Sequence, residues 1–93
     1  MQLSKKNEKT LTRILHRPVL GTIPWRDIEK LLIALGATIR EREGSRIAVT
    51  FPDDAPHVFH RPHPENVTDK GAVTNVKKLL LKKFPQFMAD FTK

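Results

Sequence analysis

Apolar residues recur at two different spacings along this chain of 93 residues. Residues 3–16, 22–35 and 71–84 repeat them every three or four positions, which indicates helices with one buried face. Between the second and third of these segments, Ile47, Val49 and Phe51 alternate with polar residues, which is typical of a strand with one buried face. The pattern therefore predicts two helices, a region of strands and a third helix.

Capping and breaking residues set the expected helix ends. Ser4 is the expected N-cap of the first helix, and Thr22 that of the second, with Pro24 in its first turn and Gly36 at its end. Thr68 or Asp69 caps the last helix, which Pro85 ends. Beyond it, the tail 85–93 carries Phe87, Met88 and Phe91, which either fold back on the domain or form a handle for a partner; folding back is favoured.

Three strands are expected at 36–42, 46–51 and 56–61, joined by turns at Gly44-Ser45 and at Pro52-Asp53-Asp54. Alternation along the first two strands directs Arg40, Arg42 and Arg46 away from the helices. The apolar helix face, which includes Trp25, would cover the other side; core is favoured for Trp25 over stacking on a base.

The register of the third strand has two solutions. If Phe59 is buried, His60 joins the arginines on the open face. If Val58 is buried instead, His57 and Arg61 are the exposed pair, because a slip of one residue exchanges the two faces.

Composition narrows the function. The net charge of +7 favours a polyanionic partner, although a basic surface can also serve solubility alone. The absence of cysteine excludes a disulfide, a thiolate zinc site and a cysteine nucleophile. No apolar run approaches the roughly 18 residues of a membrane span, and the first ten residues lack the apolar core of a signal peptide. We expect one cytoplasmic domain over 1–93, with an accessory helix at 3–16, a core at 22–84 and a tail at 85–93.

The predicted α+β order, α-β-β-β-α behind an extra N-terminal helix, resembles the double-stranded-RNA-binding-domain-like fold, in which helices cover one face of a three-stranded antiparallel sheet. Four runs are similar to the HicA family of bacterial toxin–antitoxin systems: W-R-D-I-E-K-L-L-I-A-L-G-A, R-E-R-E-G-S-R, F-H-R-P-H-P and K-G-A-V-x-x-V-K-K-L-L. The resemblance spans about residues 24–83.

This resemblance implies a small ribonuclease acting on mRNA, an mRNA interferase, that a cognate HicB-like antitoxin neutralises. It implies no cofactor, and a monomer or an assembly with the antitoxin. HicA toxins usually carry a catalytic histidine directly after the Gly-Ser pair, whereas this chain has Arg46 there. Arginine stays protonated near neutral pH and cannot act as a general base, so that role does not transfer.

Our hypothesis for the site is that His60 transfers the proton while Arg46 binds the phosphate. Further RNA contacts are expected from the other basic side chains of the sheet and last helix, which are Arg40, Arg42, Lys70, Lys77 and Lys78. The alternates are His57, His63 and Arg61. No metal site is expected, because the three histidines are not spaced as a tight chelate.

Two other functions stay open. One is an RNA-binding module of the same fold that does not cut RNA. The other is a protein-interaction domain that uses the N-terminal helix and the tail.

Overall fold

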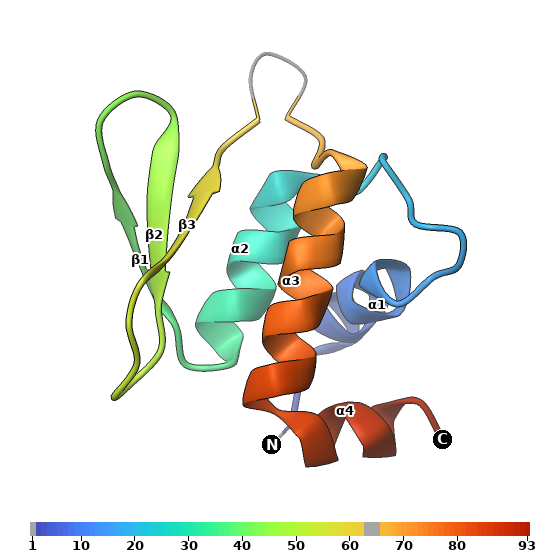
Figure 1. The fold of residues 1–93 in the computed structure, drawn as a ribbon. Coiled ribbons are helices and arrows are strands. Elements are labelled where there is room, and N and C mark those ends of the chain that lie inside the picture. Colours follow the sequence, from blue (N-terminus) through green and yellow to red (C-terminus); the bar gives the residue numbers. More distant parts are fainter. Residues whose placement is uncertain (1, 63–65) are drawn as a thin grey trace.

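The computed structural model describes residues 2–62 and 66–93. It is an α+β structure (Figure 1). The helices are α1 (Lys5–Ile14), α2 (Trp25–Ala34), α3 (Lys70–Lys83) and α4 (Pro85–Phe91), and the strands are β1 (Thr38–Glu41), β2 (Arg46–Thr50) and β3 (His57–His60). From α2 to α3 the order is the predicted α-β-β-β-α.

The three strands form one antiparallel sheet in the order β1-β2-β3. Gly44, with a φ of 70°, turns the chain between β1 and β2, and Asp53, with a φ of 61°, turns it between β2 and β3. Both turns lie where the sequence predicted them. The helices lie on one side of the sheet, so its other face has no helix against it (Figure 1).

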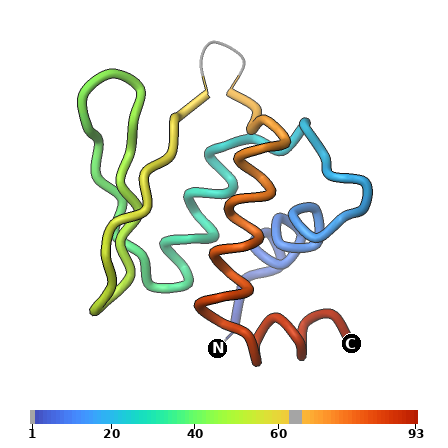
Figure 2. The backbone as a smooth tube through the Cα atoms, viewed as in Figure 1, coloured from blue at the N-terminus to red at the C-terminus, as the bar shows by residue number. Residues whose placement is uncertain are grey.

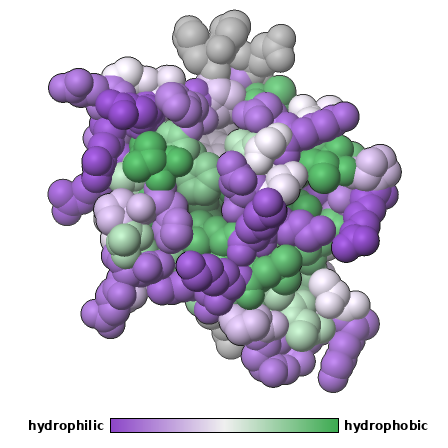
Figure 3. Space-filling model, in the orientation of Figure 1, coloured by the Kyte–Doolittle hydropathy of each residue, from purple (hydrophilic) through white to green (hydrophobic). Residues whose placement is uncertain are grey.

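The hydrophobic core lies between the sheet and the helices. Ile47, Val49 and Phe59 point into it and are at least 90% buried. Phe59 packs against Trp25 of α2, with ring centroids 5.7 Å apart, and Trp25 is 3% exposed. Figure 3 shows hydrophobic atoms mainly in the seams between the elements, with hydrophilic side chains over the outer surface. The prediction that Trp25 belongs to the core is confirmed.

Two of the predicted helix caps are confirmed and one is wrong. Ser4 accepts a hydrogen bond from the Asn7 amide at 3.1 Å, and Asp69 accepts one from the Ala72 amide at 3.1 Å. Thr22, however, lies outside α2, whose N-cap is Pro24.

A tertiary contact replaces the expected Thr22 cap. The amide of Trp25 donates to the carbonyl of Asn66 at 3.0 Å, and the amide of Thr68 donates to the carbonyl of Ile23 at 2.8 Å. Ile23 and Pro24 are therefore held extended against the segment before α3, and α2 begins at Trp25.

The C-terminal tail folds back as α4, as favoured from the sequence. Met88 is 1% exposed and lies in the core, while Phe87 and Phe91 pack beside it. Both chain ends lie at the α4 end of the molecule in Figure 2. Among the described residues, no helix has the length and apolar character needed to cross a membrane.

We expect Met88→Ala to lower the free energy of unfolding by roughly 2–4 kcal/mol, because it removes a buried side chain and leaves a cavity. Chemical denaturation measures this, with Gln86→Ala on the exposed side of α4 as the control. Equal stability of the two variants would mean that α4 does not dock in solution.

Candidate functional site

The sheet face away from the helices gathers basic side chains. Strand residues directly opposite one another point to the same face. His60 lies opposite Arg46, and Arg40 lies opposite Ala48, which in turn lies opposite Val58. The amide of Arg42, just beyond β1, donates to the carbonyl of Arg46 at 2.8 Å. We call this surface the open face; its residues are Thr38, Arg40, Arg42, Arg46, Ala48, Thr50, Val58 and His60.

Arg46 and His60 are close neighbours on this face. The Arg61 amide donates to the Ser45 carbonyl at 2.7 Å, so Ser45 and Arg61 form a hydrogen-bonded pair. The adjacent pair, Arg46 and His60, is therefore a non-hydrogen-bonded one, in which side chains approach most closely, with Cα atoms about 4.5 Å apart. A guanidinium and an imidazole thus stand side by side, both exposed to solvent.

A shallow hollow of about 680 Å³ lies beside this pair. Ala48 is its apolar floor, 3% exposed although it is on the open face. Three arginines (Arg40, Arg42 and Arg46), two glutamates (Glu41 and Glu43) and Thr50 surround it. Arg46 is steadied by a 3.3 Å hydrogen bond from its Nε to the carbonyl of Glu43. Three cations against two carboxylates leave the lining with a net positive charge, and none of the open-face residues defined above is acidic.

Phe59, not Val58, is the buried residue of β3. It is 8% exposed, whereas Val58 is 51% exposed. Of the two registers, the structure therefore has the one that places His60 with Arg46.

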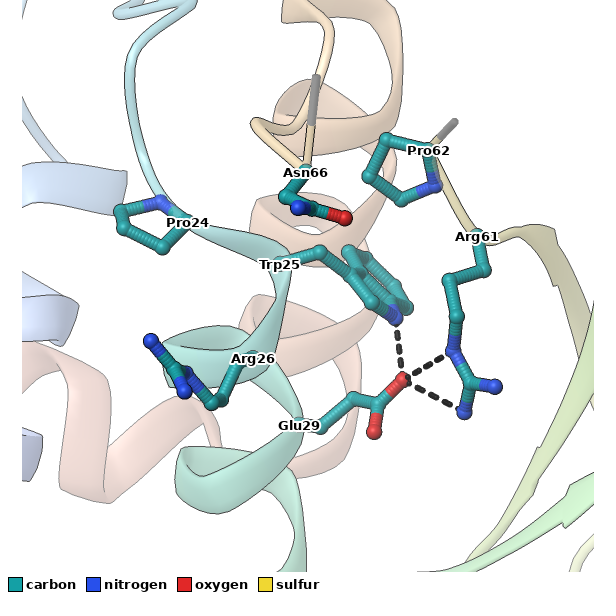
Figure 4. Close-up of a pocket in the computed structure, with 7 residues that line it drawn as sticks. All are labelled: Pro24, Trp25, Arg26, Glu29, Arg61, Pro62 and Asn66. Atoms are coloured by element: carbon teal, nitrogen blue, oxygen red, sulfur yellow. Dashed lines mark hydrogen bonds and ion pairs between the residues drawn. The ribbon is translucent and has the colours of Figure 1, made fainter. Parts of the chain in front are cut away.

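Arg61 does not lie on the open face. Its guanidinium turns toward the helices, where Nε and the terminal nitrogen Nη2 each lie 3.0 Å from Oε2 of Glu29 on α2 (Figure 4). Its other terminal nitrogen pairs with Glu41 of β1. The Trp25 indole also donates to Glu29. The Glu41 and Glu29 carboxylates raise the pKa of Arg61. The open-face position considered for Arg61 is thus wrong, because its side chain turns to the helix side and pairs with Glu29 and Glu41.

Three of these side chains, Trp25, Glu29 and Arg61, border a pocket of about 300 Å³ between α2 and the segments that flank residues 63–65 (Figure 4). Sequence reasoning missed this network. Arg61 lies 20 positions from Glu41 and 32 from Glu29, so no local spacing connects it to its partners.

His57 also points to the helix side, since it lies opposite the buried Val49. Its Nε2 is 3.2 Å from Oδ2 of Asp54, and Nζ of Lys83 on α3 is 3.3 Å from the same oxygen. The exposed His57–Arg61 pair of the alternative register is therefore not formed. His63, the other alternate, lies outside the described residues.

The lysines of α3 belong to the helix layer and not to the open face. Lys70 begins the helix, and its aliphatic carbons lie beside Gly21. Lys78 is exposed and Lys77 is half-buried. An RNA bound on the open face would have to pass around the sheet to reach them (Figure 1). No three histidine, aspartate or glutamate side chains in the described ranges are grouped to hold a metal ion.

Comparison with known families assigns this chain to a protein family. Residues 25–83 match the model of the HicA toxin of bacterial toxin–antitoxin systems, which is more than half of the chain. The chain belongs to the HicA toxin family. No curated protein and no solved structure matches it.

Membership makes this HicA-family chain a toxin of a toxin–antitoxin system, with an antitoxin as its partner. The matched range includes the whole sheet with α2 and α3. Both α1 and α4 fall outside it. The open face therefore lies within the range matched by the family, and α1 lies before that range.

We expect the two ion pairs of Arg61, with Glu29 and with Glu41, to contribute unequally to the free energy of unfolding. In a double-mutant cycle, Arg61→Gln and Glu29→Gln should couple by about 1 kcal/mol, because Glu29 is only 20% exposed and accepts from three nitrogens. Arg61 and Glu41 should couple by less than about 0.5 kcal/mol, since Glu41 is 77% exposed. Denaturation of the single and double variants measures both values. Additive effects of Arg61 and Glu29 would contradict the network.

A second prediction concerns pH. Hydrogen bonds from His57, the Ala55 amide and Lys83 lower the pKa of Asp54 below 3.8. A lowered carboxylate pKa stabilises the fold above the unfolded-state value, and this contribution disappears as pH falls through the folded-state value.

The stability difference between wild type and Asp54→Asn should therefore be full above about pH 5 and shrink as pH falls below 3.8. Asp53→Asn is the control, because Asp53 has no ion-pair partner among the described residues. Urea denaturation across this pH range provides the test. A difference that does not change with pH would show that Asp54 is not held as described.

Proposed function

We propose that this toxin is a metal-independent endoribonuclease that cuts mRNA on the open face of its sheet and is inactive while its antitoxin covers that face. The cross-strand position of Arg46 and His60 is the observation that carries the proposal. RNA cleavage without a metal needs a base near neutral pKa and a fixed positive charge at the phosphate. This pair supplies both within one neighbouring pair of side chains.

In the proposed reaction, His60 takes the proton of a ribose 2′-hydroxyl. The 2′-oxygen then bonds to the adjacent phosphorus, and the bond from phosphorus to the 5′-oxygen breaks. The leaving 5′-oxygen takes a proton from water, so the products are a 2′,3′-cyclic phosphate and a 5′-hydroxyl. Arg46 stabilises the charge that grows on the phosphate oxygens, since its guanidinium stays protonated throughout.

Arg40 and Arg42 hold the neighbouring phosphates in this proposal. Both line the hollow beside Arg46, and neither forms an ion pair among the described residues. Lys70, Lys77 and Lys78 belong to the helix layer and would contact only an RNA long enough to leave the sheet. Val58 and Ala48 give the centre of the open face an apolar patch with a basic rim. An antitoxin segment with an apolar centre and acidic flanks would fit that surface and exclude RNA.

One observation favours a second function, RNA binding without cleavage. Within the described ranges, no side chain hydrogen-bonds to the His60 ring to orient it, whereas Asp54 does so for His57. In that case the open face binds RNA through its arginines, and the antitoxin controls binding instead of cutting.

His60→Ala separates the two functions. We expect it to lower the rate of RNA cleavage about 10²–10⁴-fold, the usual contribution of a general base, while RNA binding changes little. His57→Ala is the matched control, because His57 faces the helices and should leave cleavage unchanged. Gel analysis of labelled single-stranded RNA, with EDTA present, measures the rate.

The substrate gives a second control. RNA with a 2′-deoxyribose at the cleaved position should resist wild-type protein, because the attacking oxygen is missing. Undiminished cleavage by His60→Ala would remove His60 from the mechanism. Salt-sensitive binding without any cleavage by wild type would establish the second function.

A further inference from the structure

A groove between α1 and α2 collects positive charge well away from the open face. It has a volume of about 270 Å³. Its lining is Lys6, Lys9, Thr10 and Arg13 from α1, and Asp27 and Lys30 from α2. We call it the α1–α2 groove. Figure 1 draws α1 on the side of α2 away from the sheet, so the groove and the open face are separate surfaces.

Helical spacing explains why these side chains meet. Lys6, Lys9 and Arg13 are three and four positions apart, so they follow one another along one side of α1, with Cβ atoms about 5–6 Å apart. The buried stripe of Leu11 and Ile14 fixes which side of α1 faces the core. Lys30 completes the lining from α2.

The positive charge in this groove is only partly compensated by the residues that the structure describes. Four cations surround one carboxylate, that of Asp27, and no lining residue forms an ion pair in the part of the chain that the structure describes. Arg61 and Lys83, by contrast, each lie within 3.3 Å of a carboxylate oxygen. Four like charges at this spacing repel one another, and a bound polyanion relieves that repulsion.

We propose that the α1–α2 groove binds the phosphodiester backbone of RNA, as a second contact site outside the family core. The inference takes RNA as the ligand from the proposed function. Since the family match begins at residue 25, the basic side of α1 lies outside the matched range. The groove acts on affinity for longer RNAs and takes no part in the chemistry at His60.

The lining favours a nucleic-acid backbone over an acidic protein segment. All six lining residues are polar, so the groove lacks the aromatic or aliphatic anchors that carry most of the energy in protein interfaces. The hydroxyl of Thr10 already donates to the Lys6 carbonyl at 3.2 Å. Recognition therefore rests on charge, which reads phosphates without regard to base sequence.

The test measures binding of a labelled single-stranded 20-nucleotide RNA, 2′-O-methylated throughout so that attack by a 2′-oxygen is blocked, across a series of salt concentrations. The groove variant is Lys6→Gln/Lys9→Gln/Lys30→Gln. The control, Lys5→Gln/Arg17→Gln/Lys93→Gln, makes the same change in net charge at exposed residues outside the groove. Circular dichroism confirms that each variant is folded.

Each phosphate contact on a single strand contributes about 0.7 to the slope of log Kd against log salt concentration. We expect the groove variant to lose about 2 from that slope, the value for three contacts, while the control stays near wild type. An equal slope for groove variant and control overturns the proposal. So does a wild-type protein that shows no salt-dependent binding.

A poly-glutamate peptide forms a second arm. If the groove variant loses affinity for that peptide and binds the RNA as the control does, the groove is a site for acidic protein and the proposal is wrong. Cleavage of an ordinary hexanucleotide RNA by wild type is scored in parallel. If wild type cleaves RNA but the groove variant keeps the salt slope of the control, only the groove proposal is wrong. If the groove variant has a reduced salt slope but wild type does not cleave RNA, only the nuclease assignment is wrong.

Discussion

The packing of Phe59 against Trp25 is the contact on which the candidate site depends. Successive strand residues point to opposite faces, so burying Phe59 in the core sends the next residue, His60, to the open face. The same register sets His60 opposite Arg46. A slip of one residue would bury the imidazole and expose the phenyl ring, at the cost of the apolar contact with α2. The burial of Phe59 on one side of β3 thus determines that His60 is exposed on the other side.

Helix α2 holds the end of β3 by a second, ionic contact. Trp25 packs on Phe59, and one turn later Glu29 receives the guanidinium of Arg61. Residues 59 and 61 point to the helix side and are both anchored, while His60 between them is exposed. A side chain used for proton transfer benefits from such support, because its backbone is fixed while its ring reaches solvent. Arg61 therefore supports the site without being part of it.

The positive charge of this protein is divided between two surfaces, one inside the range matched by the family and one outside it. The arginines of the open face lie within the segment shared with the HicA toxin family. The lysines of α1 lie before it, on a helix packed against the far side of α2. In the described part of the sheet, His60 is the one histidine on the open face. Helix α1 therefore carries a second basic surface, separate from the open face.

The sequence by itself determined the first three helices, the strands, both turns and the parity of the first two strands, because hydrophobic spacing, Gly44 and Asp53 act over a few residues. Alternation placed Arg40 and Arg46 together, yet it left β3 with two registers that differ by one residue. The tertiary structure decided between them, since only the position of Trp25 shows which residue of β3 the core accepts. It also decided that residues 23–25 pair with 66–68 instead of using the Thr22 cap, and that Arg61 binds Glu29. Such contacts join residues tens of positions apart, and no local pattern encodes a distance that exists only after folding.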